Sequence, residues 1–249
     1  MFEDVDQIVR WLEEHARVYD FDVIGLARRD EKPPYPLPTE PGTLANILET
    51  TAVDQLTGRL ARDSGGVQIR QGGQRTYPDM ELQGGMLGDH IVALDVKVAR
   101  RAQPPMRGGV HRTQSRISLL TGDTFFARPD QPHPGSIMRP YNAYWHHLDW
   151  IMLFDIDVAA ARPEVTNIDH VIVETWRVAS RQRSSRTRNY IGAVTALRDL
   201  REKRGAFDSR AAFERYWRDE YTDWRQTPPR ETTALTLDPE GSLSSGEPS

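Results

Sequence analysis

The stretch that most constrains the fold is a pair of apolar segments, residues 77–82 and 91–98, joined by a glycine-rich connection. β-Branched and aliphatic residues dominate the second segment, which predicts a buried strand. Pro78 has no backbone N–H to donate to a sheet, so it places Asp79 at the start or the edge of the first strand. We therefore expect two short strands that pair across the glycines.

Charged residues interrupt this apolar pair in a specific pattern. Side chains alternate between the faces of a strand, so Asp95 and Lys97 share one face, and Asp79 can meet them from the first strand. Mg²⁺ is usually held by one or two carboxylates together with waters and a substrate phosphate. Such an ion activates water and offsets phosphate charge, and a lysine can hold the attacking water. The pattern favours metal-assisted phosphodiester hydrolysis; the alternative is an edge strand with an ordinary ion pair.

Length and composition narrow the class of protein. The chain has 249 residues and no cysteine, so thiolate metal sites and disulfides are excluded. Its apolar runs are shorter than a membrane span, and residues 1–20 are acidic and amphipathic, unlike a signal peptide. We expect a cytoplasmic protein with no membrane partner. Residues 227–249 are rich in Pro, Thr, Ser and Gly, which predicts a disordered tail after a single domain over residues 1–226.

Positive charge is segregated although the net charge is -4. Residues 97–121 and residues 175–198 contain no acid, and each stretch carries several arginines. Local positive segments in an acidic chain are suited to phosphate contact. The alternative is a set of solvated, arginine-rich loops.

Periodicity and turn residues predict the remaining elements. Helices are expected over residues 5–19, over a stretch that Thr43 caps and that continues to residue 60, and over 139–147, 191–203 and 209–224. Strands are expected over residues 21–26, 67–70, 115–120, 150–156 and 171–178. The histidines show no ligand spacing, so a zinc site is not expected.

Several short motifs, in order along the chain, resemble the EcoRV family of restriction endonucleases over about residues 17–226. They are Tyr19-Asp20, Tyr35-Pro36-Leu37, the helix from Leu44 to Glu49, Tyr77-Pro78-Asp79, Ile91 to Lys97, Pro140 to His147, Asn189 to Gly192, Phe207-Asp208-Ser209 and Tyr216-Trp217-Arg218. The Pro-Asp…Asp-x-Lys pattern is shared by many nucleases, whereas the C-terminal motifs are more particular to this family.

The resemblance implies an α/β fold of the PD-(D/E)xK restriction-endonuclease-like type, with a central mixed β-sheet flanked by helices. It implies a homodimer that cleaves double-stranded DNA at a short palindrome with Mg²⁺, for which Mn²⁺ can substitute, and a cognate methyltransferase in the host. Asp79 and Asp95 would be metal ligands, Lys97 the catalytic lysine and Glu49 a supporting acid.

The resemblance also implies two DNA-binding loops. One precedes the first aspartate, approaches the minor groove and comprises Gly73, Gln74, Arg75 and Thr76. The other enters the major groove and comprises Arg183, Ser184, Ser185, Arg186, Thr187, Arg188 and Asn189. This second loop lacks the glycines of the best-known family member, and arginine is the favoured partner of guanine.

The expected activity is therefore that of a type II restriction enzyme, with GATATC as the favoured target and blunt ends. Two alternatives stay open at this point. One is a structure-specific or modification-dependent nuclease, and the other is a DNA-binding protein without catalytic activity.

Overall fold

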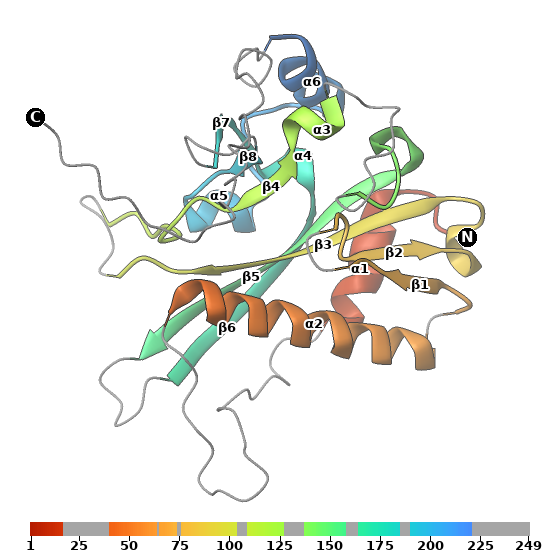
Figure 1. Ribbon diagram of the computed structural model, residues 1–249, viewed down its shortest axis with the longest axis horizontal. Helices are drawn as coiled ribbons and strands as arrows, with labels where there is room; N and C mark the ends of the chain where they lie inside the picture. Colours follow the sequence, from red (N-terminus) through yellow and green to blue (C-terminus); the bar gives the residue numbers. More distant parts are fainter. Residues whose placement is uncertain are drawn as a thin grey trace, which may run out of the picture.

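The computed structural model describes residues 1–16, 40–63, 65–73, 76–103, 109–126, 137–157, 164–184 and 190–220. A five-stranded mixed sheet runs through the middle of the molecule in the order β1-β2-β3-β5-β6 (Figure 1). Its strands are β1 (Gln68–Gln71), β2 (Met80–Gln83), β3 (Ile91–Arg100), β5 (His146–Asp157) and β6 (Glu164–Glu174). The β3–β5 pair is parallel and the other pairs are antiparallel, as a mixed α/β sheet requires. The expected fold class is confirmed.

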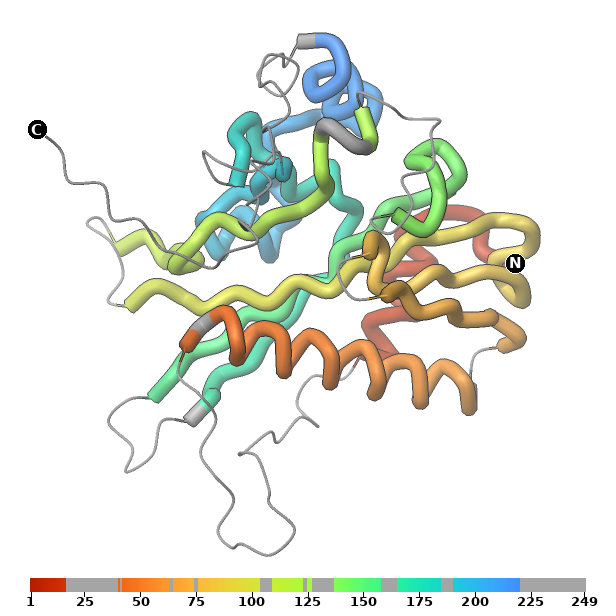
Figure 2. Tube along the Cα trace, in the orientation of Figure 1, coloured from red at the N-terminus to blue at the C-terminus, as the bar shows by residue number. Residues whose placement is uncertain are grey.

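One face of this sheet is covered by two helices, α1 (Val5–His15) and α2 (Pro41–Asp63). Both bury apolar residues at helical spacing, so the two helices and the even-numbered positions of β3 form one hydrophobic core. Its largest buried members include Ile8, Leu12, Leu44, Leu56, Leu60, Trp150 and Phe154. The N-terminus is tied to the glycine-rich connection, since the N–H of Phe2 donates to the carbonyl of Met86 at 2.8 Å (Figure 2).

The opposite face packs against a second, three-stranded sheet and the C-terminal helices, which form a second core. This sheet has the order β4-β8-β7, and its strands are β4 (Ser118–Thr121), β7 (Ala179–Arg183) and β8 (Tyr190–Ala193). The helices around it are α3 (Gly122–Phe126), α4 (Thr175–Val178), α5 (Leu197–Arg201) and α6 (Arg210–Arg215), with a π-helical turn, η4 (Tyr216–Glu220), after α6. Phe213 and Trp217 are buried there, so these two aromatic side chains belong to the second core.

The predicted hairpin is present. Strands β2 and β3 pair antiparallel with Met80 opposite Leu94, and the connection contains a short 3-10 helix, η2 (Gly85–Leu87). Gly84, Gly85 and Gly88 have φ values of 73°, 51° and 60°, a region that favours glycine. The pairing places Asp79 directly before β2.

Several predicted elements are wrong. The helix expected over residues 139–147 is a single 3-10 turn, η3 (Tyr141–Ala143), followed by β5, because His146 and His147 pair with β3. The helix expected from residue 191 begins instead as strand β8, and the strand expected over 171–178 ends at Glu174. Glu40 rather than Thr43 caps α2: its carboxylate accepts the N–H groups of Gly42 at 2.9 Å and Thr43 at 2.5 Å.

Other predictions fall outside the described residues. The strand over 21–26 and the tail over 227–249 lie there, as do Tyr19 and Trp224 at the ends of two expected helices.

Candidate active site

The structure brings the two predicted aspartates together at the start of β2. The backbone N–H of Asp79 donates to Oδ1 of Asp95 at 3.2 Å, and the backbone N–H of Val96 donates to Oδ2 of Asp79 at 2.6 Å. Each carboxylate therefore has one oxygen oriented by the backbone of the neighbouring strand. Two side chains that extend from adjacent strands are fixed relative to each other by the sheet itself.

Lys97 completes this cluster. Its Nζ forms an ion pair with Oδ2 of Asp95, and the side chains are 22% and 5% exposed. Burial alone would lower the pKa of Lys97, but the charges of Asp95 and Asp79 outweigh it and raise that pKa. Lys97 is thus a permanent cation beside Asp79 and Asp95 at physiological pH.

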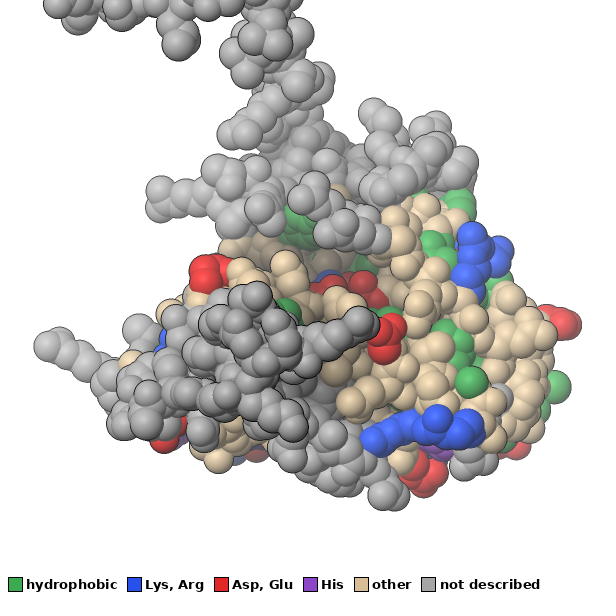
Figure 3. All heavy atoms as spheres, turned by 60° about the horizontal axis from the view of Figure 1, so that its bottom comes forward, with side chains coloured by type: hydrophobic (Ala, Val, Ile, Leu, Met, Phe, Trp, Pro, Cys, Tyr) green, Lys and Arg blue, Asp and Glu red, His purple; other side chains and the backbone are tan. Residues whose placement is uncertain are grey.

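Glu49 borders the same cluster from helix α2, as predicted. It is half-buried, burial raises its pKa, and the charge of Lys97 opposes that rise. Since the charge of Glu49 in turn raises the pKa of Asp79, all four predicted catalytic residues interact electrostatically. In Figure 3, which turns the α2 side of the molecule forward, acidic side chains lie in a hollow near the centre of the face.

The donor set suits a divalent cation. Burial and the charge of Asp95 raise the pKa of Asp79 to about 8. A nearby cation stabilises a carboxylate pair of this kind, because its charge offsets both the repulsion between the two carboxylates and the cost of removing them from water. Among the described residues no group of three or more His, Cys, Asp or Glu is arranged to hold a metal. Asp79 and Asp95 would therefore share the ion with water and phosphate oxygens, as Mg²⁺ prefers.

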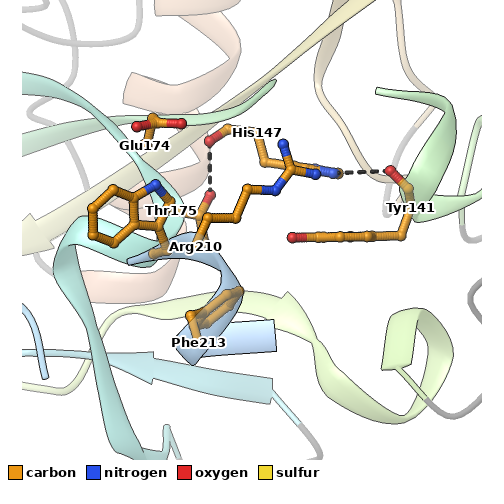
Figure 4. Close-up of a pocket in the computed structure, with 7 residues that line it drawn as sticks. Tyr141, His147, Glu174, Thr175, Arg210 and Phe213 are labelled. Carbon is orange, nitrogen blue, oxygen red and sulfur yellow. Dashed lines mark hydrogen bonds between the residues drawn. The ribbon is translucent and has the colours of Figure 1, made fainter. Parts of the chain in front are cut away.

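The segment that carries Asp79 is anchored by a buried histidine. Nε2 of His147 lies 3.0 Å from the carbonyl oxygen of Tyr141, which can only accept, so Nε2 carries the hydrogen (Figure 4). Nδ1 then accepts from the hydroxyl of Tyr77 at 2.8 Å. Burial and the charge of Arg210 lower the pKa of His147 to about 3, so the ring is neutral. This chain of hydrogen bonds, from Tyr77 through His147 to Tyr141, thereby holds the backbone in place two residues before Asp79.

Two further buried acids on this face were missed by the sequence reasoning. Glu81 is fully buried and accepts from Nε of Arg139 at 2.9 Å and from the hydroxyl of Tyr144 at 2.7 Å. Asp149 on β5 is 1% exposed and pairs in register with Asp95. Both acids interrupt apolar strands as Asp95 does, and that signal could have found them.

The predicted DNA-binding residues lie in two places. Gly73 and Thr76 flank the entry to Asp79, while Gln74 and Arg75 lie outside the described residues. Arg183 and Ser184 end strand β7, and the N–H of Ser184 donates to the carbonyl of Tyr190 at 2.9 Å. This pairing closes the base of the β7–β8 connection. The rest of the predicted major-groove loop also lies outside the described residues; it comprises Ser185, Arg186, Thr187, Arg188 and Asn189.

The comparisons with known proteins agree with this architecture. In the described part of the chain, no helix has the length and apolar character needed to cross a membrane. No curated protein matches the chain. The family model described as restriction endonuclease EcoRV matches residues 18–237. That match covers most of the sequence, including the Asp79–Asp95–Lys97 cluster. The chain belongs to the EcoRV family of restriction endonucleases, which are type II site-specific deoxyribonucleases that bind and cut double-stranded DNA.

Proposed function

We propose that this restriction endonuclease hydrolyses DNA in a Mg²⁺-dependent reaction at the cluster formed by Asp79, Asp95 and Lys97. The observation that carries the proposal is the pair of backbone hydrogen bonds that hold the two carboxylates together, with the lysine ammonium beside them. EcoRV-like nucleases generally use divalent metal ions. Mn²⁺ has the same preference for oxygen ligands and is expected to substitute.

Each residue then has a distinct role. Asp79 and Asp95 would hold the ion, which would supply water activation and charge stabilisation at the phosphate. Lys97 holds the attacking water by hydrogen bonds and offsets negative charge as the phosphorus gains a fifth oxygen. Glu49 adds negative charge beside the ligands and supports cation binding from helix α2.

The protein would act as a homodimer, because two-fold symmetric proteins read palindromic sites with one active site for each strand. GATATC is the target we favour, with blunt ends and protection of the host genome by a cognate methyltransferase. We propose that residues 1–226 form a single domain in which DNA-binding and catalytic segments are intertwined.

Recognition would come from the two predicted DNA-binding loops. Gly73, Gln74, Arg75 and Thr76 would approach the minor groove. The segment 183–189 would enter the major groove, where Arg186 or Arg188 reads a base and the other arginine meets phosphate.

Digestion of a long DNA of known sequence, followed by sequencing of the fragment ends, tests this function. The proposal predicts discrete fragments with Mg²⁺, none with a chelator, and blunt ends centred on one palindrome. A smear of fragments would indicate a non-specific nuclease. DNA binding without cleavage in any divalent ion would contradict the proposal.

Alanine substitution separates the roles of the loop arginines. Arg186→Ala or Arg188→Ala should cost about 1–3 kcal/mol in binding and relax specificity at one position if that arginine reads a base. A phosphate contact should weaken all sequences alike. Normal binding and cutting by both variants would remove the segment 183–189 from the DNA interface.

A further inference from the structure

Asp149 is a buried acid that the proposed mechanism does not use. It lies in the middle of strand β5, is 1% exposed, and neither of its carboxylate oxygens has a hydrogen-bond partner among the described residues. The nearby hydroxyl of Thr175 donates instead to the carbonyl of His147 at 3.3 Å. A buried carboxylate without partners is costly, so its retention calls for a physical explanation.

The position of Asp149 relates it to the catalytic strand. It lies directly opposite Asp95 in the parallel β3–β5 pair, and Ile151, two residues along, is the register partner of Lys97. Paired residues in a sheet share a face, so Asp149, Asp95 and Lys97 point to the same side. The Cα atoms of Lys97 and Asp149 are separated diagonally by roughly 8 Å, which follows from the strand spacing and rise and is within reach of a lysine side chain.

Two cations would compete for Asp95. Its Oδ1 accepts the N–H of Asp79, and its Oδ2 forms the ion pair with Lys97. A divalent ion ligated by Asp95 needs one of these oxygens and also repels the ammonium. Lys97, whose side chain is only 22% exposed, would then be a charge without its partner, which is unfavourable. The unpartnered carboxylate of Asp149 is within its reach on the same face.

The electrostatics agree with this geometry. Burial raises the pKa of Asp149 to about 7, and the charge of Lys97 opposes that rise while the charge of Asp95 adds to it. The charge of Asp149 in turn helps to raise the pKa of Lys97. The two residues therefore already interact while Lys97 is paired with Asp95.

We propose that Asp149 is a positioning residue that accepts the Lys97 ammonium when a divalent ion takes the carboxylate of Asp95. The inference rests on the proposed function, because it assumes that Asp79 and Asp95 are the metal ligands. Lys97 alternates between two carboxylates on neighbouring strands, and Asp149 holds it next to the scissile phosphate during catalysis. Asp149 itself touches neither the ion nor the substrate.

Calorimetric titration of the purified protein with Mn²⁺ at pH 8, in a double-mutant cycle of Asp149→Asn and Lys97→Met, tests this proposal. With Lys97 present, Asp149→Asn should weaken Mn²⁺ binding about tenfold or more, because the ammonium loses the negative charge of its second partner. In the Lys97→Met background the same change should weaken binding by less than about threefold, since only the direct charge effect remains. Asp157→Asn, at the exposed end of the same strand, is the matched control and should leave Mn²⁺ binding unchanged.

Equal weakening by Asp149→Asn in both backgrounds, or no weakening in either, would overturn the role of Asp149. The Asp79→Asn variant distinguishes a failure of the role of Asp149 from a failure of the proposed function. If wild type does not bind Mn²⁺, or binds it equally well without the Asp79 carboxylate, the metal site is wrong and the inference fails with it. Should Asp149→Asn not fold, Asp149→Ser, which is also uncharged, repeats the cycle with the same expected outcomes.

Discussion

A single methyl group at Gly72 should displace Asp79, a proposed metal ligand. A Cβ at this position would lie 2.3 Å from the carbonyl oxygen of Pro78 and 3.2 Å from that of Thr76. Ordinary van der Waals contact is at about 3.5 Å, so the two backbones must separate by roughly 1 Å. The N–H of Gly72 also donates to the carbonyl of Asp79 at 2.7 Å, which transmits the displacement directly. A misplacement of about 1 Å at a reacting group can cost about 100-fold in rate.

The neighbouring glycine supplies a matched control. Among the described residues, a Cβ at Gly73 would meet only the Oγ1 of Thr76 at 3.4 Å, an ordinary contact with the end of a side chain. Neither glycine has a φ in the left-handed region, so alanine can adopt the φ value at both positions, and the two variants differ only in what the added Cβ contacts.

The assay is the single-turnover cleavage rate with enzyme in saturating excess over DNA and with saturating Mg²⁺, which removes any effect of the Gly73 loop on DNA affinity. We expect Gly72→Ala to be slowed about 100-fold and Gly73→Ala to stay within a few-fold of wild type. Far-UV circular dichroism would verify that both variants are folded. A Gly72→Ala enzyme as fast as Gly73→Ala would refute the claim that the position of Asp79 limits the rate.

Three further predictions concern stability. The pKa of Asp79, raised to about 8 by burial and Asp95, means that the folded protein retains a proton that the unfolded chain releases near pH 4. The stability that this proton contributes is therefore present at low pH and lost as pH rises towards 8. With a chelator present, the free energy of unfolding of Asp79→Asn in urea should rise relative to that of wild type between pH 5 and 8, by about 1–4 kcal/mol. A difference between the two proteins that stays constant with pH would contradict this. Tyr77→Phe should lower the free energy of unfolding by about 1–3 kcal/mol, because Nδ1 of buried His147 loses its donor, and an unchanged urea midpoint would show that this bond is not needed. Ser209, whose Oγ accepts the N–H of Ala212 at 3.1 Å, caps α6, so Ser209→Ala should cost about 1 kcal/mol, and a thermal midpoint equal to that of wild type would contradict the cap.

The hairpin that carries Asp79 and Asp95 was predictable because its signals are local. The proline before Asp79, the glycines of the connection and the alternation around Asp95 each act within a few residues. Together they indicated the two strands and the faces that bring Asp79 to Asp95, while the pairing register came from the structure. Where local patterns and tertiary pairing agree, the sequence alone was sufficient to predict the element.

The helix expected over residues 139–147 failed for the opposite reason. His146 and His147 belong to β5 because they pair with β3, a strand some 50 residues away, and nothing local indicates a parallel partner. This error also concealed Asp149, because the expected strand began only at residue 150. Asp149, the register partner of Asp95, was therefore outside every predicted motif.

The arginine-rich segments were only partly informative. Arg101 donates to the carbonyl of Asn167 at 2.6 Å and pairs with Asp155, while Arg116 donates to the carbonyl of Ala193 at 2.8 Å and to Gln182 at 2.7 Å. These arginines join strands within the protein. Charge counted along a chain does not distinguish such internal partners from a phosphate, because the acids and carbonyls that pair with them are distant in sequence.

The central claim is that the Asp95 carboxylate supports divalent-ion-dependent cleavage of DNA. Its most direct test is the single-turnover cleavage rate of Asp95→Asn in Mg²⁺, beside Asp89→Asn as an exposed control in the same hairpin. We predict that wild type and Asp89→Asn produce discrete fragments at equal rates, while Asp95→Asn binds the same DNA and leaves it uncut. Cleavage by Asp95→Asn at the wild-type rate would contradict the account.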